Sequence, residues 1–272
     1  VRSRRQRQMC IRDSMMGVTL GTLGAGGSIL ILPILIYFFS INPVLATSYS
    51  LIIVGITALI GSIQNLISKN IDLKTALKFS ISAIFMTYIT RRYILPIIPD
   101  TIYLFNKPLS KDLFILILFS LLMTFAGYLM IKPKNKKKLN HIYLYNKFLI
   151  NLFILVEGAI VGFLTGLVGA GGGFLIIPAL VIFLNLNMKI AVGTSLLIIL
   201  LKSLIGVIGD LQYGVTLNTN LLFSIVFFTS IGILLGSYFN KKLNAEKLKV
   251  AFGYFTLLIS IACLLYTSPS PR

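Results

Sequence analysis

Eight long apolar segments, separated by short polar or turn-forming stretches, constrain most strongly how this chain can fold. They lie near residues 16–39, 44–67, 76–98, 112–131, 148–184, 190–209, 220–239 and 250–265. About 20 apolar residues of helix cross the hydrocarbon core of a bilayer, whereas an isolated strand cannot satisfy its backbone polar groups in lipid. The segments are also continuous, unlike the alternating strands of a membrane barrel. We therefore expect an all-α integral membrane protein that crosses the cell membrane several times.

The charge content agrees with lipid as the main solvent. Only 12% of the 272 residues are charged and 57% are hydrophobic, too few charges to cover a soluble surface. The formal net charge is +18, and the lysine run at 132–138 follows an apolar segment directly. This pattern is typical of loops held at an anionic membrane surface, so we interpret the basic character as a membrane feature and not as nucleic-acid binding.

The two ends differ from the rest of the chain. Residues 1–14 hold five arginines, and residues 264–272 end an apolar segment abruptly. We expect both stretches to be non-native. Neither cysteine belongs to a CxxC pair or to a metal-ligand spacing, so the sequence predicts no metal site and no cofactor.

An internal repeat organises the remainder. Shifting the chain by 145 residues aligns GVTLGTLGAGGSILILP (17–33) with GFLTGLVGAGGGFLIIP (162–178), with nine of 17 positions identical and no gap. The same register continues through the following segment. We therefore predict two homologous repeats of four segments each, at 15–131 and 148–263, joined by a basic linker at 132–147.

Glycine clusters break one helix in each repeat. The stretch 148–184 is too long for a single span, and four glycines within 169–173 cannot hold a regular helix well. Broken helices survive at membrane depth where they line a polar cavity, and a half-helix N-terminus favours an anion. The predicted substrate-binding residues at the two breaks are Gly24, Gly26, Gly27, Ser28, Gly169, Gly171, Gly172 and Gly173. The alternative is close helix packing through small residues, which is all that Gly162 and Gly166 need do. The spacing and flanks fit neither a dinucleotide fingerprint nor a P-loop.

A few polar side chains inside apolar segments are further candidates. Lys202 lies deep in its segment and is expected to neutralise an anion or to pair with Glu157, since charges in a membrane are costly. The alternatives are that Lys202 reaches an interface and that Glu157 lies near the membrane surface. Thr194 and Ser195, with Ser50 as the repeat partner of Ser195, are candidate cavity donors or merely bond to their own helices.

The glycine motifs carry a family resemblance. Two segments of each repeat resemble the TauE/SafE family of sulfite exporter and sulfonate permease-like membrane proteins. They are GFLTGLVGAGGGFLIIPAL (162–180) with AVGTSLLII (191–199), and GTLGAGGSILILPILIY (21–37) with ATSYSLIIVG (46–55). The resemblance implies a helical transporter of small anions, often sulfur compounds, and no enzymatic chemistry. Ser28 departs from the pattern, because the second repeat has Gly173 there, so the two halves are expected to contribute unequally.

We therefore predict a non-enzymatic transporter of a small anion, a sulfur-containing oxyanion or an organosulfonate, working by alternating access between the repeats. A channel-like or uniport route, a membrane-embedded enzyme and a structural scaffold are the alternatives. The expected partners are the solute and the bilayer, without nucleic acid, and homo-oligomer formation stays open.

Overall fold

The computed structural model describes residues 28–37, 39, 41–99, 101–104, 107–131, 147–169, 171–212, 219–242 and 244–267. The first glycine cluster, with Gly24, Gly26 and Gly27, lies outside these residues. So do the head at 1–14, all of the basic linker except Lys147, and the end of the tail after Thr267.

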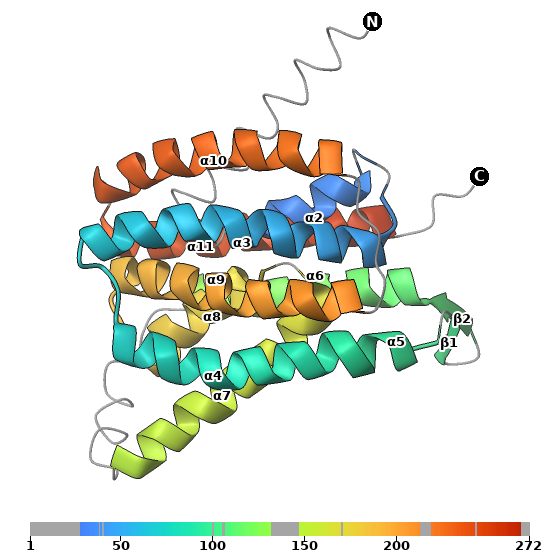
Figure 1. The fold of residues 1–272 in the computed structure, drawn as a ribbon, viewed down its shortest axis with the longest axis horizontal. Coiled ribbons are helices and arrows are strands. Elements are labelled where there is room, and N and C mark those ends of the chain that lie inside the picture. Colours follow the sequence, from blue (N-terminus) through green and yellow to red (C-terminus); the bar gives the residue numbers. More distant parts are fainter. Residues whose placement is uncertain are drawn as a thin grey trace, which may run out of the picture.

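Helices make up almost all of the described chain (Figure 1). In chain order the helices are α2 (Ser28–Tyr37), α3 (Pro43–Ile67), α4 (Leu73–Ile89), the π-helical turn η2 (Thr90–Ile94), α5 (Leu95–Ile97), α6 (Lys111–Ile131), α7 (Lys147–Val168), α8 (Gly173–Pro178), the π-helical turn η3 (Ala179–Phe183), α9 (Met188–Gln212), α10 (Thr219–Lys242) and α11 (Ala245–Thr267). Within the described residues, five helices are long and apolar enough to cross a membrane, namely α3, α6, α7, α9 and α11. The chain is therefore a multi-pass membrane protein.

One small departure from an all-α fold follows α5. Strands β1 (Thr101–Leu104) and β2 (Lys107–Ser110) pair antiparallel and form a hairpin at the end of α4–α5 (Figure 1). The hairpin occupies the polar connection between two apolar segments, and β1 and β2 satisfy their backbone groups by pairing with each other.

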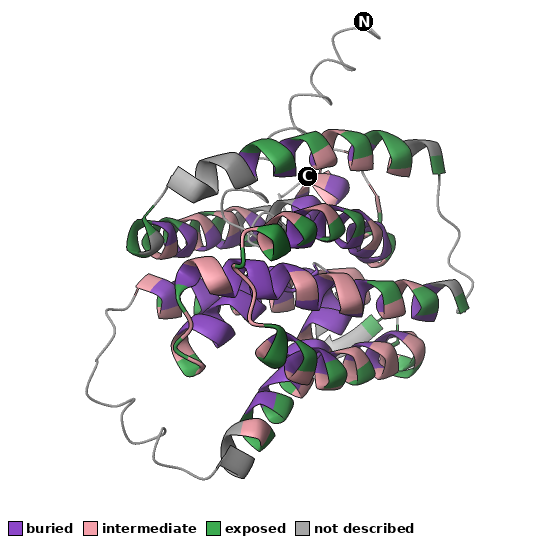
Figure 2. Cartoon of the chain, turned by 60° about the vertical axis from the view of Figure 1, so that its left-hand side comes forward, coloured by how far each residue is buried: buried purple, intermediate pink, exposed green. Residues whose placement is uncertain are grey.

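Helices α3 and α9 form the centre of the bundle. They pack on each other, α4 packs on α9 and α7, α10 packs on α3, and α6 packs on α11. Buried residues gather in the middle of the molecule, whereas exposed residues lie along the outer helices (Figure 2). Many exposed side chains are large and apolar, as a lipid-facing surface requires; Phe85, Phe223 and Leu258 are examples.

Three glycines of α7 allow α4 to approach closely. A Cβ built at Gly158 would lie 2.7 Å from the Phe79 carbonyl oxygen, and one at Gly162 would lie 2.7 Å from Ala83 Cα. Farther along α7, Gly166 lies against Thr90 of η2. Gly162 and Gly166 therefore serve helix packing, the alternative stated above for this pair.

Candidate functional site

The second glycine cluster interrupts the helix as its composition predicts. Helix α7 ends at Val168, and α8 begins at Gly173. Between them Gly169, Gly171 and Gly172 have φ values of +68°, +66° and +81°, in the left-handed region that side chains disfavour. A turn of this kind forms only where several glycines stand together. The chain consequently changes direction inside the protein core, next to α3, η2 and α9.

A buried ion pair lies against this turn. Arg91, on the π-helical turn η2, is fully buried, and its Nη1 atom is 3.2 Å from Asp210 Oδ2 near the end of α9. Nη1 also donates to Thr47 Oγ1 of α3 at 2.9 Å. The Nη2 atom lies directly against Gly169, where a Cβ would overlap it. The lack of a side chain at Gly169 therefore makes room for the guanidinium.

A second cation lies on the other side of the same turn. Lys202 of α9 is fully buried, and its Nζ atom donates to Thr165 Oγ1 of α7. A Cβ at Gly172 would lie 2.6 Å from that Nζ atom. The turn between Gly169 and Gly172 thus carries a cation at each end, one from η2 and one from α9. We call Arg91, Lys202, Asp210, Thr47 and Thr165 the break cluster.

The break cluster holds more positive than negative charge. Two cations and one carboxylate give a formal charge of +1, and among the described residues Lys202 has only a neutral hydroxyl as partner. The Arg91 Nε and Nη2 groups have no hydrogen-bond partner among the described residues. Buried polar groups are normally paired, and an uncompensated buried charge is costly. An anion is the ligand that would correct both imbalances.

Sequence reasoning overlooked half of this arrangement. Arg91 lies inside the apolar segment 76–98, so the rule that singled out Lys202 applies equally to it. The π-helical turn at Arg91 agrees with the tendency of such turns to occur at functional sites. Thr47 and Thr165 are ordinary threonines in sequence, and nothing in the pattern marks them.

The expected pairing of Lys202 with Glu157 is wrong. Lys202 is hydrogen-bonded to Thr165, and neither carboxylate oxygen of Glu157 has a partner within the described chain. Both residues are buried among the helices, and Lys202 bonds to Thr165 and does not extend to an interface. The two side chains belong to different parts of the core.

The hydroxyl candidates have separate roles. Thr194 Oγ1 accepts from the backbone N–H of Asp72 at 3.0 Å, which holds the start of α4 against α9. Ser195 donates to the Val192 carbonyl of its own helix at 2.8 Å. Ser50 is fully buried and its hydroxyl has no partner among the described residues. Ser50 lies one helical turn from Thr47 on α3, so it stays a candidate whereas Thr194 and Ser195 are bound elsewhere.

The other predicted glycines and Ser28 are placed as follows. Gly171 lies against Val54 of α3, and Gly173 is the first residue of α8. Ser28 is the first residue of α2, and its side chain is outside the described part.

We expect Thr194→Val to lower the stability of the protein without changing its affinity for the transported solute. The loss of one acceptor for a part-buried N–H should lower stability by about 1 kcal/mol, because a typical hydrogen bond contributes that much. The half-saturation concentration for transport should not change. Thermal unfolding in detergent and uptake into proteoliposomes measure the two effects, with Thr194→Ser as the control that keeps the hydroxyl. A weaker apparent affinity in Thr194→Val alone would return Thr194 to the binding site.

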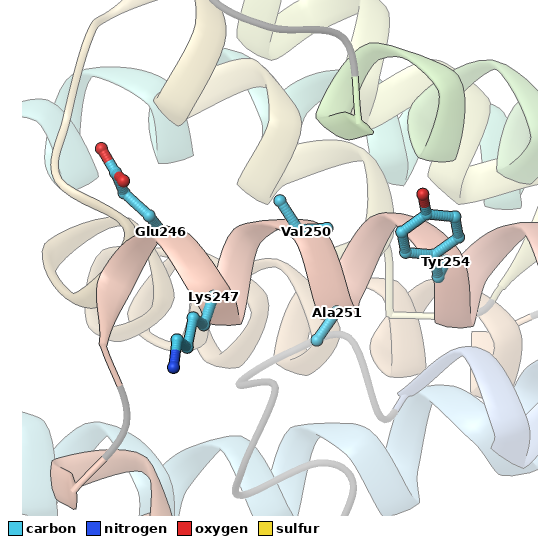
Figure 3. Close-up of a pocket in the computed structure, with 5 residues that line it drawn as sticks. All are labelled: Glu246, Lys247, Val250, Ala251 and Tyr254. Carbon is cyan, nitrogen blue, oxygen red and sulfur yellow. The ribbon is translucent and has the colours of Figure 1, made fainter.

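A surface groove of about 440 Å³ lies elsewhere, on α11 (Figure 3). It is lined by Glu246, Lys247, Val250, Ala251 and Tyr254. The groove shares no residue with the break cluster, and its side chains come from a single helix.

Comparison with known proteins agrees with this architecture. The model of the family "Sulfite exporter TauE/SafE" matches residues 14–263. The "Probable membrane transporter protein YunE" of Bacillus subtilis is 26% identical over 90% of this chain and 93% of its own length. A "Probable membrane transporter protein" of Xylella fastidiosa is 26% identical over 91% of this chain and 90% of its own length. One from Methanocaldococcus jannaschii is 26% identical over 92% of each chain. No solved structure matches the chain.

Because the family model covers residues 14–263 and the relatives are probable membrane transporters, the chain belongs to the TauE/SafE family of membrane transporters.

Proposed function

We propose that this protein moves a small anion, a sulfur-containing oxyanion or an organosulfonate, by alternating access around a site framed by the two glycine breaks. The observation that carries the proposal is the break cluster, in which a buried net charge of +1 lies beside a helix break. A transported cation would be repelled there, and a neutral solute would leave the excess charge uncompensated.

The free edge of Arg91 favours an oxyanion. Nη1 donates to Asp210 and Thr47, whereas the neighbouring Nε and Nη2 groups have no partner in the part of the chain that the structure describes. These two N–H groups form the fork that binds two oxygens of a carboxylate, sulfonate or similar group side by side. A spherical halide would use such a fork less well than a group with two oxygens.

Packing at the centre of the bundle supports two repeats related by a two-fold axis. Helices α3 and α9 begin and end 145 residues apart, which is the shift of the sequence repeat. Leu196 of α9 packs against Gly61 of α3, and Leu51 of α3 packs against Gly206 of α9. Gly206 is the repeat counterpart of Gly61, and Leu196 is that of Leu51, so the two contacts are equivalent. Such reciprocal contacts are typical of two-fold interfaces.

The same shift of 145 residues shows that the charges at the second break have no charged counterparts around the first. The repeat counterparts of Arg91, Lys202 and Asp210 are Gly236, Thr57 and Asn65, none of which is charged. The anion is therefore expected to contact mainly the second break, with the first break as the opposing wall. In this scheme one repeat rocks against the other around the bound anion.

Lys202→Met tests the proposal. Methionine keeps the length and the apolar stem but removes the charge, so we expect an apparent affinity at least about tenfold weaker, equivalent to about 1.4 kcal/mol. Lys202→Arg should keep partial activity. Uptake of sulfite, thiosulfate, sulfonates and carboxylates into proteoliposomes is the measurement, with surface Lys247→Met as the matched control. An unchanged half-saturation concentration in Lys202→Met would remove this residue from the site. Failure of the whole panel in the wild-type protein would overturn anion transport itself.

A further inference from the structure

Glu157 is the buried charged residue that the break cluster does not use. It lies near the middle of α7, within the part of this helix that is long and apolar enough to cross a membrane. Its side chain is buried, and both carboxylate oxygens lack a hydrogen-bond partner in the described residues. An ionised carboxylate without a partner is costly at such a position, and a protonated one costs much less.

Among the described residues, the neighbouring elements place no cation in an ion pair with Glu157. Helix α9 contacts α7 through the Lys202–Thr165 hydrogen bond and carries Lys189, Lys202 and Asp210, whereas η3 contacts α7 through an aromatic pair and has no ionisable side chain. The elements packed most closely against α7 are α4, η2, α6 and α8. Their ionisable side chains are Lys74, Lys78 and Tyr88 of α4, Arg91, Arg92 and Tyr93 of η2, and Lys111, Asp112 and Tyr128 of α6, whereas α8 has none. The ionisable side chains closest to Glu157 along the axis of α7 are on α4, where Lys78 Nζ donates to Asn151 Oδ1 at 2.7 Å. Arg91 is engaged by Asp210, and Lys111 by the carbonyls of Leu95 and Ile98.

The missing partner of Glu157 is more simply a proton than a metal ion. A metal cation bound by oxygen needs several ligands, and the described residues contain no group of three or more His, Cys, Asp or Glu able to hold one. A proton needs only one carboxylate oxygen. Protonation would neutralise the carboxylate without any further ligand from the neighbouring helices.

Glu157 is positioned to sense the anion. Glu157, Val161 and Thr165 follow one another at four-residue steps on one buried face of α7, and Thr165 accepts from Lys202. Eight residues of helix place Glu157 about 12 Å from that contact. At an effective dielectric constant of about 20, a carboxylate at this distance weakens anion binding about tenfold. Because linkage is reciprocal, a bound anion strengthens proton binding by the same factor.

We infer that Glu157 is a proton-binding site that couples anion movement to a proton moving in the same direction. The inference rests on the proposed anion transport. The proton adds to a Glu157 carboxylate oxygen when the anion occupies the break cluster, and it leaves that oxygen on the other side of the membrane as the anion departs. One residue on α7, on the same buried face as Thr165 beside the helix break, thus links both ligands to the same moving element.

Proteoliposomes loaded with a pH-sensitive dye test the coupling. The membrane potential is clamped with potassium and valinomycin, and thiosulfate or methanesulfonate is the probe because each stays ionised across the pH range. In the wild-type protein an inside-alkaline gradient of about one pH unit should drive accumulation of up to about tenfold, with proton entry seen by the dye. Glu157→Gln should abolish both accumulation and proton entry but keep anion–anion exchange without a gradient.

The controls separate the coupling from the transport. Glu246→Gln removes the same charge from the exposed surface of α11 and should remain fully coupled. Glu157→Gln that still accumulates the anion in response to pH would overturn the inference, as would wild-type net uptake that ignores the pH gradient or responds to sodium instead. Absence of exchange in the wild-type protein would overturn the proposed transport function and, with it, this coupling.

Discussion

Replacing Arg91 by methionine is expected to remove most of the folded protein from the membrane. The substitution leaves Asp210 buried beside Thr47 without its counter-ion. Breaking a buried ion pair from one side costs about 3–5 kcal/mol, most of it the penalty of the remaining charge. The amount of monodisperse protein recovered in mild detergent, and its thermal unfolding, measure this loss.

The double variant Arg91→Met with Asp210→Asn separates folding from transport. It removes both charges, so folded protein should return to near the wild-type amount, because a pair replaced as a whole is often close to neutral. Transport should stay lost, since the N–H fork that we assign to the oxyanion is absent. Arg92→Met is the matched control: Arg92 is partly exposed and bonds a backbone carbonyl at 3.4 Å, so little change is expected. Normal anion affinity in the double variant would limit Arg91 to a structural role.

Gly172→Val is expected to abolish transport while the protein still reaches the membrane. Gly172 has a φ of +81°, and a left-handed residue with a branched side chain is strained by about 1–2 kcal/mol or more. The new Cβ would also lie 2.6 Å from Lys202 Nζ, so the ammonium group would have to leave its place beside the turn. Uptake at matched protein amounts, quantified by immunoblotting of the membrane fraction, measures the effect.

Gly206→Ala is the control for this variant. Gly206 is a helical glycine of α9, where a Cβ would lie 3.3 Å from Leu51 Cδ1 and requires only a small shift. Alanine also favours the helix, so transport should be retained. Near-normal transport in Gly172→Val would show that the turn serves only packing and does not approach a substrate.

Segment lengths and the helix break were readable from the sequence because they depend on local chemistry. Lipid requires long apolar helices, so the segments near 44–67 and 190–209 predict α3 and α9 to within a few residues. Four glycines in five positions cannot continue a helix, and α7 accordingly ends at Val168. The glycine motifs likewise identified the TauE/SafE family. The matching superposition of Gly26 on Gly171 stays a prediction, because Gly26 lies outside the described residues.

Only the tertiary structure decided which charges meet. In the sequence each buried charge is a cost without a named partner, and Glu157 was the plausible one for Lys202. The fold instead brings Asp210 to Arg91 from 119 residues away and gives Lys202 the Thr165 hydroxyl. In the fold Thr194 accepts a hydrogen bond from the start of α4, whereas its neighbour Ser195 donates to a carbonyl of its own helix. Adjacent residues on a helix point about 100° apart, so their partners depend on which helices pack on each side, and no local pattern records that.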